Sequence, residues 1–398
     1  MYKLEENLLK ILNICYFVIC FSLLIKIEKI VSVSLLLTFV LIFIIWIKQL
    51  RDCINKIDLL VIIIFILSTI NVFINATMTN TIINFNYIKK LIMFCSSLIY
   101  FSSLLKINIS KIKIKKTIKI ISDILAILFI LFYLIYGNRM YIMNGIISNY
   151  LCFNFSNPNL LALFLTAICM SELNFLLLEN NKIKKIIYIV ICLFLIYFIL
   201  ETKARICSIV IILYVFFMLY YKLKNKIKFS PIILKITSIF PIIFVLLYFW
   251  LINNIKFLSF LSFLSSEGKE LSSRQTIWMY AIENLKKNPI FGAYSQISNG
   301  LGSSQMHNTH LDIITSYGLI VFVLFCVWLF LILTSLNKKS ESFAQFINIF
   351  SFIMLLLCGI SEAALFAASL GLNVYVGNFL LLANSSNNEV KKNENNIY

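Results

Sequence analysis

Charged residues are scarce in this sequence, and so are the residues that break helices. Only 13% of the 398 residues are charged, and the chain has four prolines and ten glycines. A soluble domain carries about twice that share of charge, whereas here 61% of the residues are hydrophobic and apolar runs follow one another along the chain. This composition excludes an ordinary soluble domain and indicates a membrane protein.

The apolar runs are continuous and do not alternate with polar residues, which is typical of membrane helices and not of a membrane β-barrel. We therefore predict an all-α fold, a polytopic membrane helical bundle of about twelve transmembrane helices, since one crossing needs about 20 apolar residues. The whole chain, 1–398, would form a single integral membrane domain. The predicted crossings are 8–25, 30–47, 57–75, 86–105, 117–136, 158–178, 185–200, 204–221, 231–252, 311–334, 343–361 and 368–384.

Basic residues outnumber acidic ones by 35 to 17, and their location decides what this excess means. The lysines cluster in KINISKIKIKKTIK, KIKK, KLKNKIK and NKK, which follow even-numbered crossings and therefore share one side. Loops rich in lysine and arginine stay in the cytoplasm. We expect both termini, including the polar tail 385–398, to be cytoplasmic. The lysines orient the bundle, and we expect no nucleic-acid partner.

Residues that bind metals or nucleotides are also scarce. The ten cysteines show no paired spacing such as CxxC, and most lie inside apolar runs as small hydrophobic residues. The two histidines, His307 and His310, are close enough to share a metal, but no third ligand is evident beside them. The sequence has no Gly-rich phosphate loop and no dinucleotide-binding fingerprint. We therefore expect no metal site and no cofactor.

One connection is much longer than the others, and it is predicted to be a large extracytoplasmic loop at 253–310. Within it, SSRQTIWMYAIENLKKNP predicts an amphipathic helix that Ser272 caps and a proline follows. Arg274 then falls in the first turn, where backbone N–H groups and the helix dipole favour an anion such as phosphate. An ion pair of Arg274 with Glu267 or Glu270 is the alternative.

Arginine occurs four times, at Arg51, Arg139, Arg205 and Arg274, and the last three fall on the outer side. Since lysine supplies the orientation, these outer arginines indicate recognition of phosphate or carboxylate, which suits a planar guanidinium. Arg205, in LETKARICSIV, lies at the outer mouth of the eighth crossing, where charges usually face a cavity. Pairing with Glu201 is the alternative.

Both histidines lie in HNTHLDIITSYGL, where the long loop gives way to the outer end of the tenth crossing. A neutral His307 could act as a general base, oriented by the carboxylate of Asp312; an inert surface histidine is the alternative. His310 could support this site or serve in packing and hydrogen bonding. Glu362, near the outer end of the eleventh crossing, could join the arginines as a counter-charge.

Several segments, taken in their order along the chain, resemble one family. They are FSNPNLLA at 155–162, TKAR at 202–205, then Arg274, Trp278, Ala281, Pro289 and Gly292, and finally His307 and Asn308 followed after nine residues by Gly318. By these pieces the sequence resembles the Wzy and WaaL group of polysaccharide polymerases and O-antigen ligases. It departs from the family at Ala204, where a serine commonly stands, after Gly292, where a second glycine is missing, and at Val321. The last departure favours a polymerase over a ligase.

The resemblance implies a metal-independent membrane glycosyltransferase in the cytoplasmic membrane of a bacterium. Its substrate would be an oligosaccharide carried by undecaprenyl diphosphate, so the protein must hold a diphosphate and remove a proton from an acceptor hydroxyl. The residues assigned to this chemistry are His307 as the general base, Arg205, Arg274 and Arg139 as diphosphate ligands, and Asn308, His310, Asp312 and Glu362 as supporting residues.

We predict a polymerase that joins lipid-linked repeat units of an O-antigen or capsular polysaccharide at the outer face of the membrane. A flippase and a chain-length regulator are the partner proteins that such a pathway suggests. Two alternatives stay open: a ligase that transfers a lipid-linked glycan to another acceptor, and a flippase or transporter for the same lipid. Transporters often have two similar halves, and the sequence shows no clear repeat.

Overall fold

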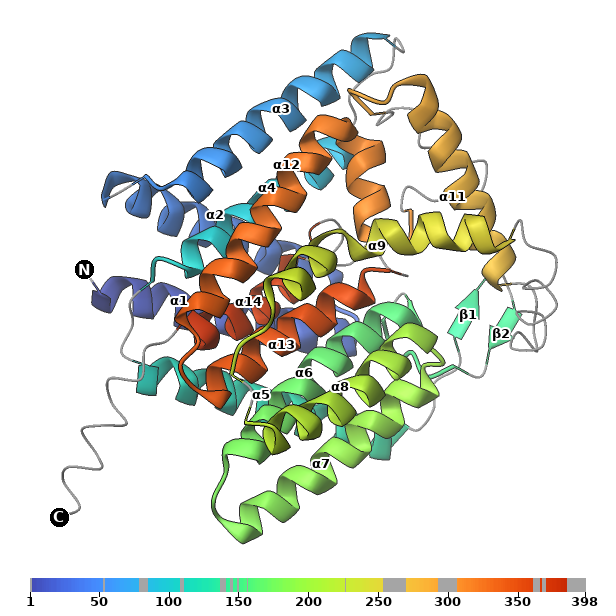
Figure 1. Ribbon diagram of the computed structural model, residues 1–398. Coiled ribbons are helices and arrows are strands. Elements are labelled where there is room, and N and C mark those ends of the chain that lie inside the picture. Colours follow the sequence, from blue (N-terminus) through green and yellow to red (C-terminus); the bar gives the residue numbers. More distant parts are fainter. Residues whose placement is uncertain are drawn as a thin grey trace.

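In the described residues, the protein is a helical bundle with one short pair of strands (Figure 1). The computed structural model describes residues 2–52, 54–78, 85–107, 111–136, 141–143, 146–148, 150–155, 157–225, 227–252, 270–292, 306–360, 366 and 370–384. Within these residues, eight helices are long and apolar enough to cross a membrane, and two further apolar helices are shorter. The predicted polytopic membrane bundle is confirmed.

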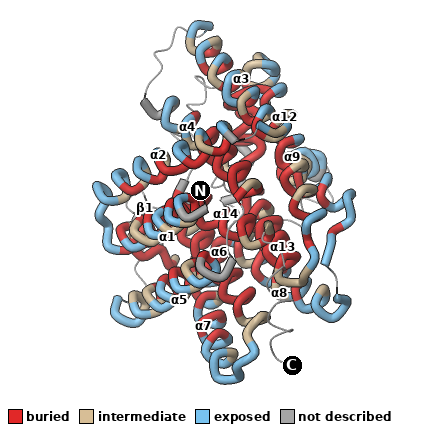
Figure 2. Tube along the Cα trace, turned by 90° about the vertical axis from the view of Figure 1, so that its left-hand side faces the viewer, coloured by how far each residue is buried: buried red, intermediate tan, exposed pale blue. Residues whose placement is uncertain are grey.

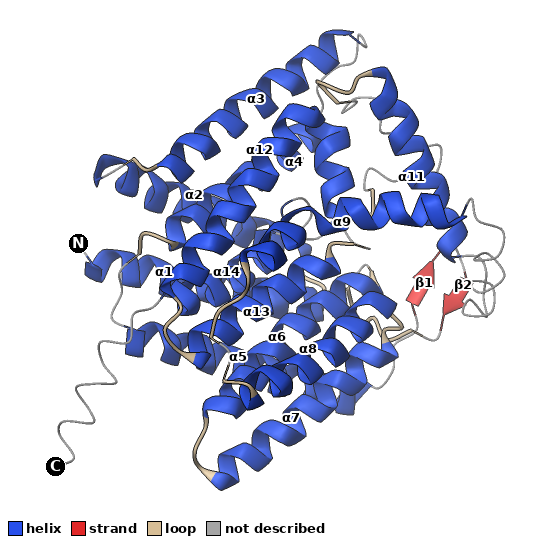
Figure 3. Ribbon diagram, viewed as in Figure 1, coloured by secondary structure: helices blue, strands red, loops and turns tan. Residues whose placement is uncertain are grey.

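A helix stands at the place of each predicted crossing (Figure 3). These helices are α1 (Tyr2–Ile25), α2 (Glu28–Asp52), α3 (Lys56–Met78), α4 (Phe85–Leu104), α5 (Lys111–Tyr136), α6 (Pro158–Leu178), α7 (Lys182–Glu201), α8 (Arg205–Leu223), α9 (Pro231–Ile252), α12 (Thr309–Lys339), α13 (Phe343–Cys358) and α14 (Leu370–Asn384). One more helix, α11 (Glu270–Lys287), falls in the predicted long loop. The strands β1 (Tyr141–Met143) and β2 (Ile146–Ser148) pair antiparallel.

Some of the predicted segments lie outside the described residues. In the predicted loop 253–310, this applies to residues 253–269 and 293–305. It also applies to the whole of the predicted tail 385–398.

Lysine side chains mark one end of the bundle. Lys106, just after α4, pairs with Asp58 at the start of α3, and Lys119 of α5 lies 3.6 Å from Glu179, just after α6. Lys339 of α12 donates to a carbonyl just after α4 at the same end, at 3.4 Å. We call this the lysine-rich end. Because successive helices run in opposite directions, α4 and α8 both begin at the opposite end.

The outer surface of the bundle is largely apolar. The helix α6 is almost entirely buried, whereas α2, α7 and α8 carry long exposed apolar faces (Figure 2). Such faces are too large for the surface of a soluble monomer, but they suit contact with lipid. The apolar faces of these peripheral helices therefore suit a lipid environment.

The helix α12 differs from the predicted tenth crossing, because it folds back on itself at Gly318 (Figure 1). Gly318 has φ 85° and ψ 173°, which is not helical. As a result the ring of His310 lies 5.4 Å from the ring of Phe325, although a straight helix would separate these residues by about 22 Å. The helix α12 thus has a short limb, 309–317, and a long limb, 319–339.

Candidate functional site

Asn308 fixes the start of the short limb. Its side-chain oxygen accepts a hydrogen bond from the backbone N–H of Leu311 at 2.9 Å, which makes it the N-cap. Its side-chain nitrogen donates to the carbonyl of Pro241 in α9 at 3.1 Å and to that of Ile360, just after α13, at 3.0 Å. One fully buried amide therefore ties the limb to two other helices.

His307 precedes this cap in a strained conformation. Its φ is 49°, in the left-handed region, which costs a non-glycine residue about 1–2 kcal/mol and persists only where the surroundings enforce it. Its side chain is half-buried. Because Asn308 contacts Pro241, halfway along the 22-residue α9, the His307 turn lies beside the middle of that helix. The sequence had placed it at the outer end of a straight crossing, and the fold-back at Gly318 explains the difference.

His310 is a buried packing residue. Its Nε2 lies 2.8 Å from the carbonyl oxygen of Ser238, and since a carbonyl only accepts, Nε2 carries the proton. The ring packs edge-on against Phe322 and Phe325. These contacts support packing and hydrogen bonding, the second of the two roles that the sequence allowed for His310.

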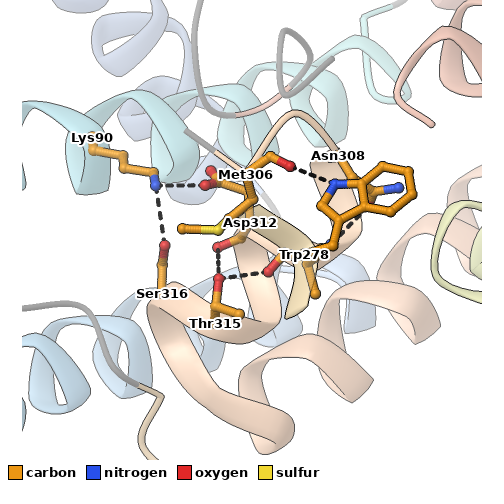
Figure 4. A network of polar contacts seen from close by, with 8 residues as sticks. Lys90, Trp278, Met306, Asn308, Asp312, Thr315 and Ser316 are labelled. Atoms are coloured by element: carbon orange, nitrogen blue, oxygen red, sulfur yellow. Dashed lines mark hydrogen bonds and ion pairs between the residues drawn. The ribbon is translucent and has the colours of Figure 1, made fainter. Parts of the chain in front are cut away.

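Asp312 is paired with a lysine that the sequence analysis did not single out. Its Oδ1 lies 2.8 Å from Nζ of Lys90 in α4, and the same ammonium donates to the hydroxyl of Ser316 at 3.1 Å (Figure 4). The carboxylate that we expected to orient His307 is thus held by Lys90. One sequence signal was available: Lys89 and Lys90 stand at the start of α4, opposite the lysine-rich end, against the general charge bias.

The helix α11 packs against the beginning of this segment. The indole N–H of Trp278 donates to the carbonyl of Met306 at 2.8 Å, and Trp278 is buried (Figure 4). The predicted amphipathic helix is confirmed, but it begins at Glu270 and not after Ser272. Arg274 consequently lies in the second turn, so the argument that placed it among unpaired N–H groups at the helix start does not hold.

Arg205 is the first residue of α8, and its side chain is exposed. In the described part of the chain this guanidinium takes part in no ion pair. The turn before it is fixed by Thr202, whose hydroxyl accepts from the N–H of Ala204 at 3.3 Å. Next to it, the ammonium of Lys203 lies 4.7 Å from the ring centre of Tyr150. The turn therefore presents Arg205 at the end opposite the lysine-rich end.

A protein family model described as O-antigen ligase (Wzy_C) matches residues 188–326. We refer to this matched segment as the O-antigen ligase domain, after the description of the model. The domain runs from α7 into the long limb of α12 and includes Arg205, α11 and the His307 turn. The match agrees with the resemblance to the Wzy and WaaL group and indicates a membrane enzyme of glycosyltransferase type. A search of curated proteins finds no match.

Three of the predicted diphosphate or supporting groups are not placed by the structure. Arg139 and Glu362 lie outside the described residues, and of Arg274 only the backbone is described. Whether Arg205, His307 and these three groups meet in one site stays a prediction. The described part of the O-antigen ligase domain contributes Arg205, His307 and the buried anchor Asn308.

The described cysteines do not contribute a reactive thiolate to this site. The described cysteines are all buried and free, as expected for small hydrophobic residues. Burial raises the pKa of the Cys152 thiol to about 12, so this thiol stays protonated at neutral pH. A protonated thiol is a poor nucleophile.

Two glycines allow the segment after α11 to pack closely against the bend of α12 at Gly318, which we call the elbow. Gly292 has φ 78° and Gly318 has φ 85°. A Cβ atom at Gly318 would lie 1.9 Å from the carbonyl oxygen of Ile290, and one at Gly292 would lie 2.7 Å from that of Thr315. Backbone touches backbone here, so only glycine fits. Both glycines belong to the pieces that resembled the Wzy and WaaL group.

Two asparagines of α3 close the elbow from the other side. The side-chain amide of Asn71 donates to the carbonyl of Tyr317, and that of Asn75 donates to the carbonyl of Phe291 at 2.7 Å. Both asparagines are buried. The elbow is therefore held by a helix that lies outside the O-antigen ligase domain.

We expect Gly318→Ala to destabilise the folded protein strongly. The added methyl group meets a backbone carbonyl that cannot swing aside, and the positive φ alone costs about 1–3 kcal/mol. Thermal unfolding of the purified protein in detergent measures the effect. Gly371→Ala is the matched control, because its Cβ would meet only side-chain atoms of Ile19, at 3.2 Å, and no backbone. Equal melting temperatures for the two variants would contradict the conclusion that only glycine fits at position 318.

Proposed function

We propose that the protein is a polysaccharide polymerase that joins oligosaccharide repeat units carried by undecaprenyl diphosphate. The main support is an O-antigen ligase domain in which an exposed arginine, Arg205, begins a helix at the end opposite the lysine-rich end. Lysine-rich loops face the cytoplasm, so Arg205 would act at the outer face of the cytoplasmic membrane. There a flippase would deliver the lipid-linked units.

The reaction needs one base and one anion site. In the proposed mechanism, His307 takes the proton of an acceptor hydroxyl as the hydroxyl oxygen attacks the anomeric carbon of the donor sugar. The bond from that carbon to the diphosphate oxygen breaks, and its electron pair leaves with the lipid diphosphate. Arg205, with Arg274 and Arg139, would neutralise the leaving group. Because the diphosphate is already a good leaving group, these side chains suffice without a metal.

The acceptor separates the two forms of this proposal. In a polymerase the attacking hydroxyl belongs to a second lipid-linked repeat unit. In a ligase it belongs to another lipid, a wall polymer or a protein, and the O-antigen ligase description of the matched family favours this alternative. Val321, at the end of a segment in which ligases often carry a small or aromatic residue, favours the polymerase.

The purified protein incubated with lipid-linked repeat units alone tests the proposal. A polymerase produces a ladder of longer glycans without any added acceptor. A single transfer that requires a distinct acceptor would establish the ligase instead. If neither product forms but the units cross a vesicle membrane, the protein is a transporter and the proposal is wrong.

We expect excess chelator to leave the rate of glycan formation unchanged. In the proposed mechanism arginine side chains take the role that a metal ion plays in many other transferases. The assay compares initial rates with and without EDTA, on protein that was dialysed against EDTA beforehand. A rate that falls and is restored by zinc or magnesium would overturn the metal-independent mechanism.

A further inference from the structure

We infer that Lys90 is a positioning residue for this reaction, which holds the short limb of α12 so that His307 faces its substrate. The inference rests on the proposed function, in which His307 is the general base. Lys90 belongs to α4 and lies outside the O-antigen ligase domain at 188–326. It would make the first part of the chain necessary for the geometry of the site.

A short chain of contacts leads from Lys90 to the His307 turn. The ammonium lies 2.8 Å from Oδ1 of Asp312. The backbone N–H of Asp312 donates to the carbonyl of Asn308 at 2.9 Å. Asn308 directly follows His307. One ion pair, drawn in Figure 4, and one backbone hydrogen bond therefore separate Lys90 from the residue next to the proposed base.

Lys90 also helps to fix the rotation of the limb about its own axis. Its ammonium contacts both Asp312 and Ser316, which are four residues apart and so lie on the same face of the helix. Asn308 anchors the start of the limb and Gly318 its end. His310 restrains the same limb through its hydrogen bond to the carbonyl of Ser238. The contact with Lys90 adds a restraint on the face that carries Asp312 and Ser316.

The ion pair of Lys90 and Asp312 is buried enough that the loss of either charge should affect its surroundings. The side chain of Asp312 is 1% exposed and that of Lys90 is 16% exposed. Removal of one partner leaves an uncompensated charge in a region of low dielectric constant. Around the turn, α9 and α13 present the carbonyls of Pro241 and Ile360, which do not titrate. His310, on the limb itself, donates to a carbonyl.

The test compares pH–rate profiles of single and paired substitutions. In Lys90→Met, the lone carboxylate of Asp312 would favour the protonated form of His307, so the acidic limb of the profile should move to higher pH. In Asp312→Asn, the lone ammonium disfavours protonation, and the limb should move to lower pH. In the double variant both charges are absent, and the limb should return towards that of the native protein. A contact that only stabilised the fold would not produce shifts of opposite sign.

Turnover should fall along with these shifts. We expect Lys90→Met to lower kcat by about tenfold to a hundredfold, because a base displaced by about 1 Å loses that much, while KM for the donor stays nearly constant. Lys90→Arg should recover most of the rate. Lys89→Met is the matched control, since Lys89 is the exposed neighbour on the same helix, and it should behave like the native protein.

The outcomes separate this inference from the proposed function. If His307→Asn is inactive but Lys90→Met keeps native turnover and an unshifted profile, Lys90 has no positioning role and the proposed base stands. If His307→Asn keeps full activity, the proposed function itself fails. Should Lys90→Met not fold, the double variant with Asp312→Asn still decides: native turnover in it would overturn the inference, and reduced turnover in a folded protein would support it.

Discussion

Replacement of His307 should abolish sugar transfer in a protein that still folds and still binds its lipid-linked donor. A positioned general base contributes about 10²- to 10⁴-fold to the rate, so kcat should fall by about that factor. His307→Asn is the best variant, because asparagine tolerates the left-handed backbone at φ 49° and cannot act as a base at neutral pH. Initial rates with saturating donor give kcat, and donor binding is measured separately.

His310 provides the control for this experiment. It is the only other histidine of the chain, and it is buried with its ring between aromatic side chains and its Nε2 on a carbonyl. We expect His310→Asn to lower the melting temperature and to leave the turnover of the folded fraction close to native. If His310→Asn lost turnover and His307→Asn did not, the roles of the two histidines would be reversed.

The bundle could be predicted from the sequence because its signals are local. A continuous apolar run long enough to cross a bilayer must be a helix, since lipid offers no partner to the backbone. The same holds for α11, where Trp278 and Ala281 recur at helical spacing and both are buried. The start of α11 was predicted three residues too late, because Ser272 resembled an N-cap whereas the helix already begins at Glu270.

The elbow of α12 could not be predicted, because its cause is not local. Gly318 stands in an apolar stretch, where a glycine is tolerated within a helix. The fold-back depends on the carbonyl of Ile290 and on the amide of Asn71, both distant in the sequence. The ion pair of Lys90 with Asp312 joins residues 222 positions apart. Each of these contacts changes where the histidines lie, and none leaves a periodic signal.

The geometry of the site therefore depends on contacts from both parts of the chain. The O-antigen ligase domain supplies Arg205 and the His307 turn. The helices α3 and α4 supply the Asn71 amide and the Lys90 ammonium that hold the short limb. Since a rigid support is needed to keep a base in place, we expect the isolated segment 188–326 to lack transferase activity.

Arg205→Lys should weaken the use of the donor although it preserves the charge. A guanidinium can hold two oxygens of a diphosphate in one plane, and an ammonium cannot. We expect kcat/KM for the lipid-linked donor to fall by about tenfold or more, since a charge-assisted hydrogen bond contributes about 1.5–3 kcal/mol. Inorganic diphosphate should also inhibit the variant less than it inhibits the native protein.

The chain offers a matched control for this substitution. Arg51 is exposed at the end of α2, at the lysine-rich end of the bundle, so Arg51→Lys makes the same chemical change away from the proposed site and should leave kcat/KM unchanged. Equal losses in both variants would mean that the protein is sensitive to arginine content in general. Native kcat/KM in Arg205→Lys would exclude Arg205 as a diphosphate ligand. Of the three outer arginines, Arg205 is the one whose side chain the structure describes. The proposed common role of the outer arginines would then fail.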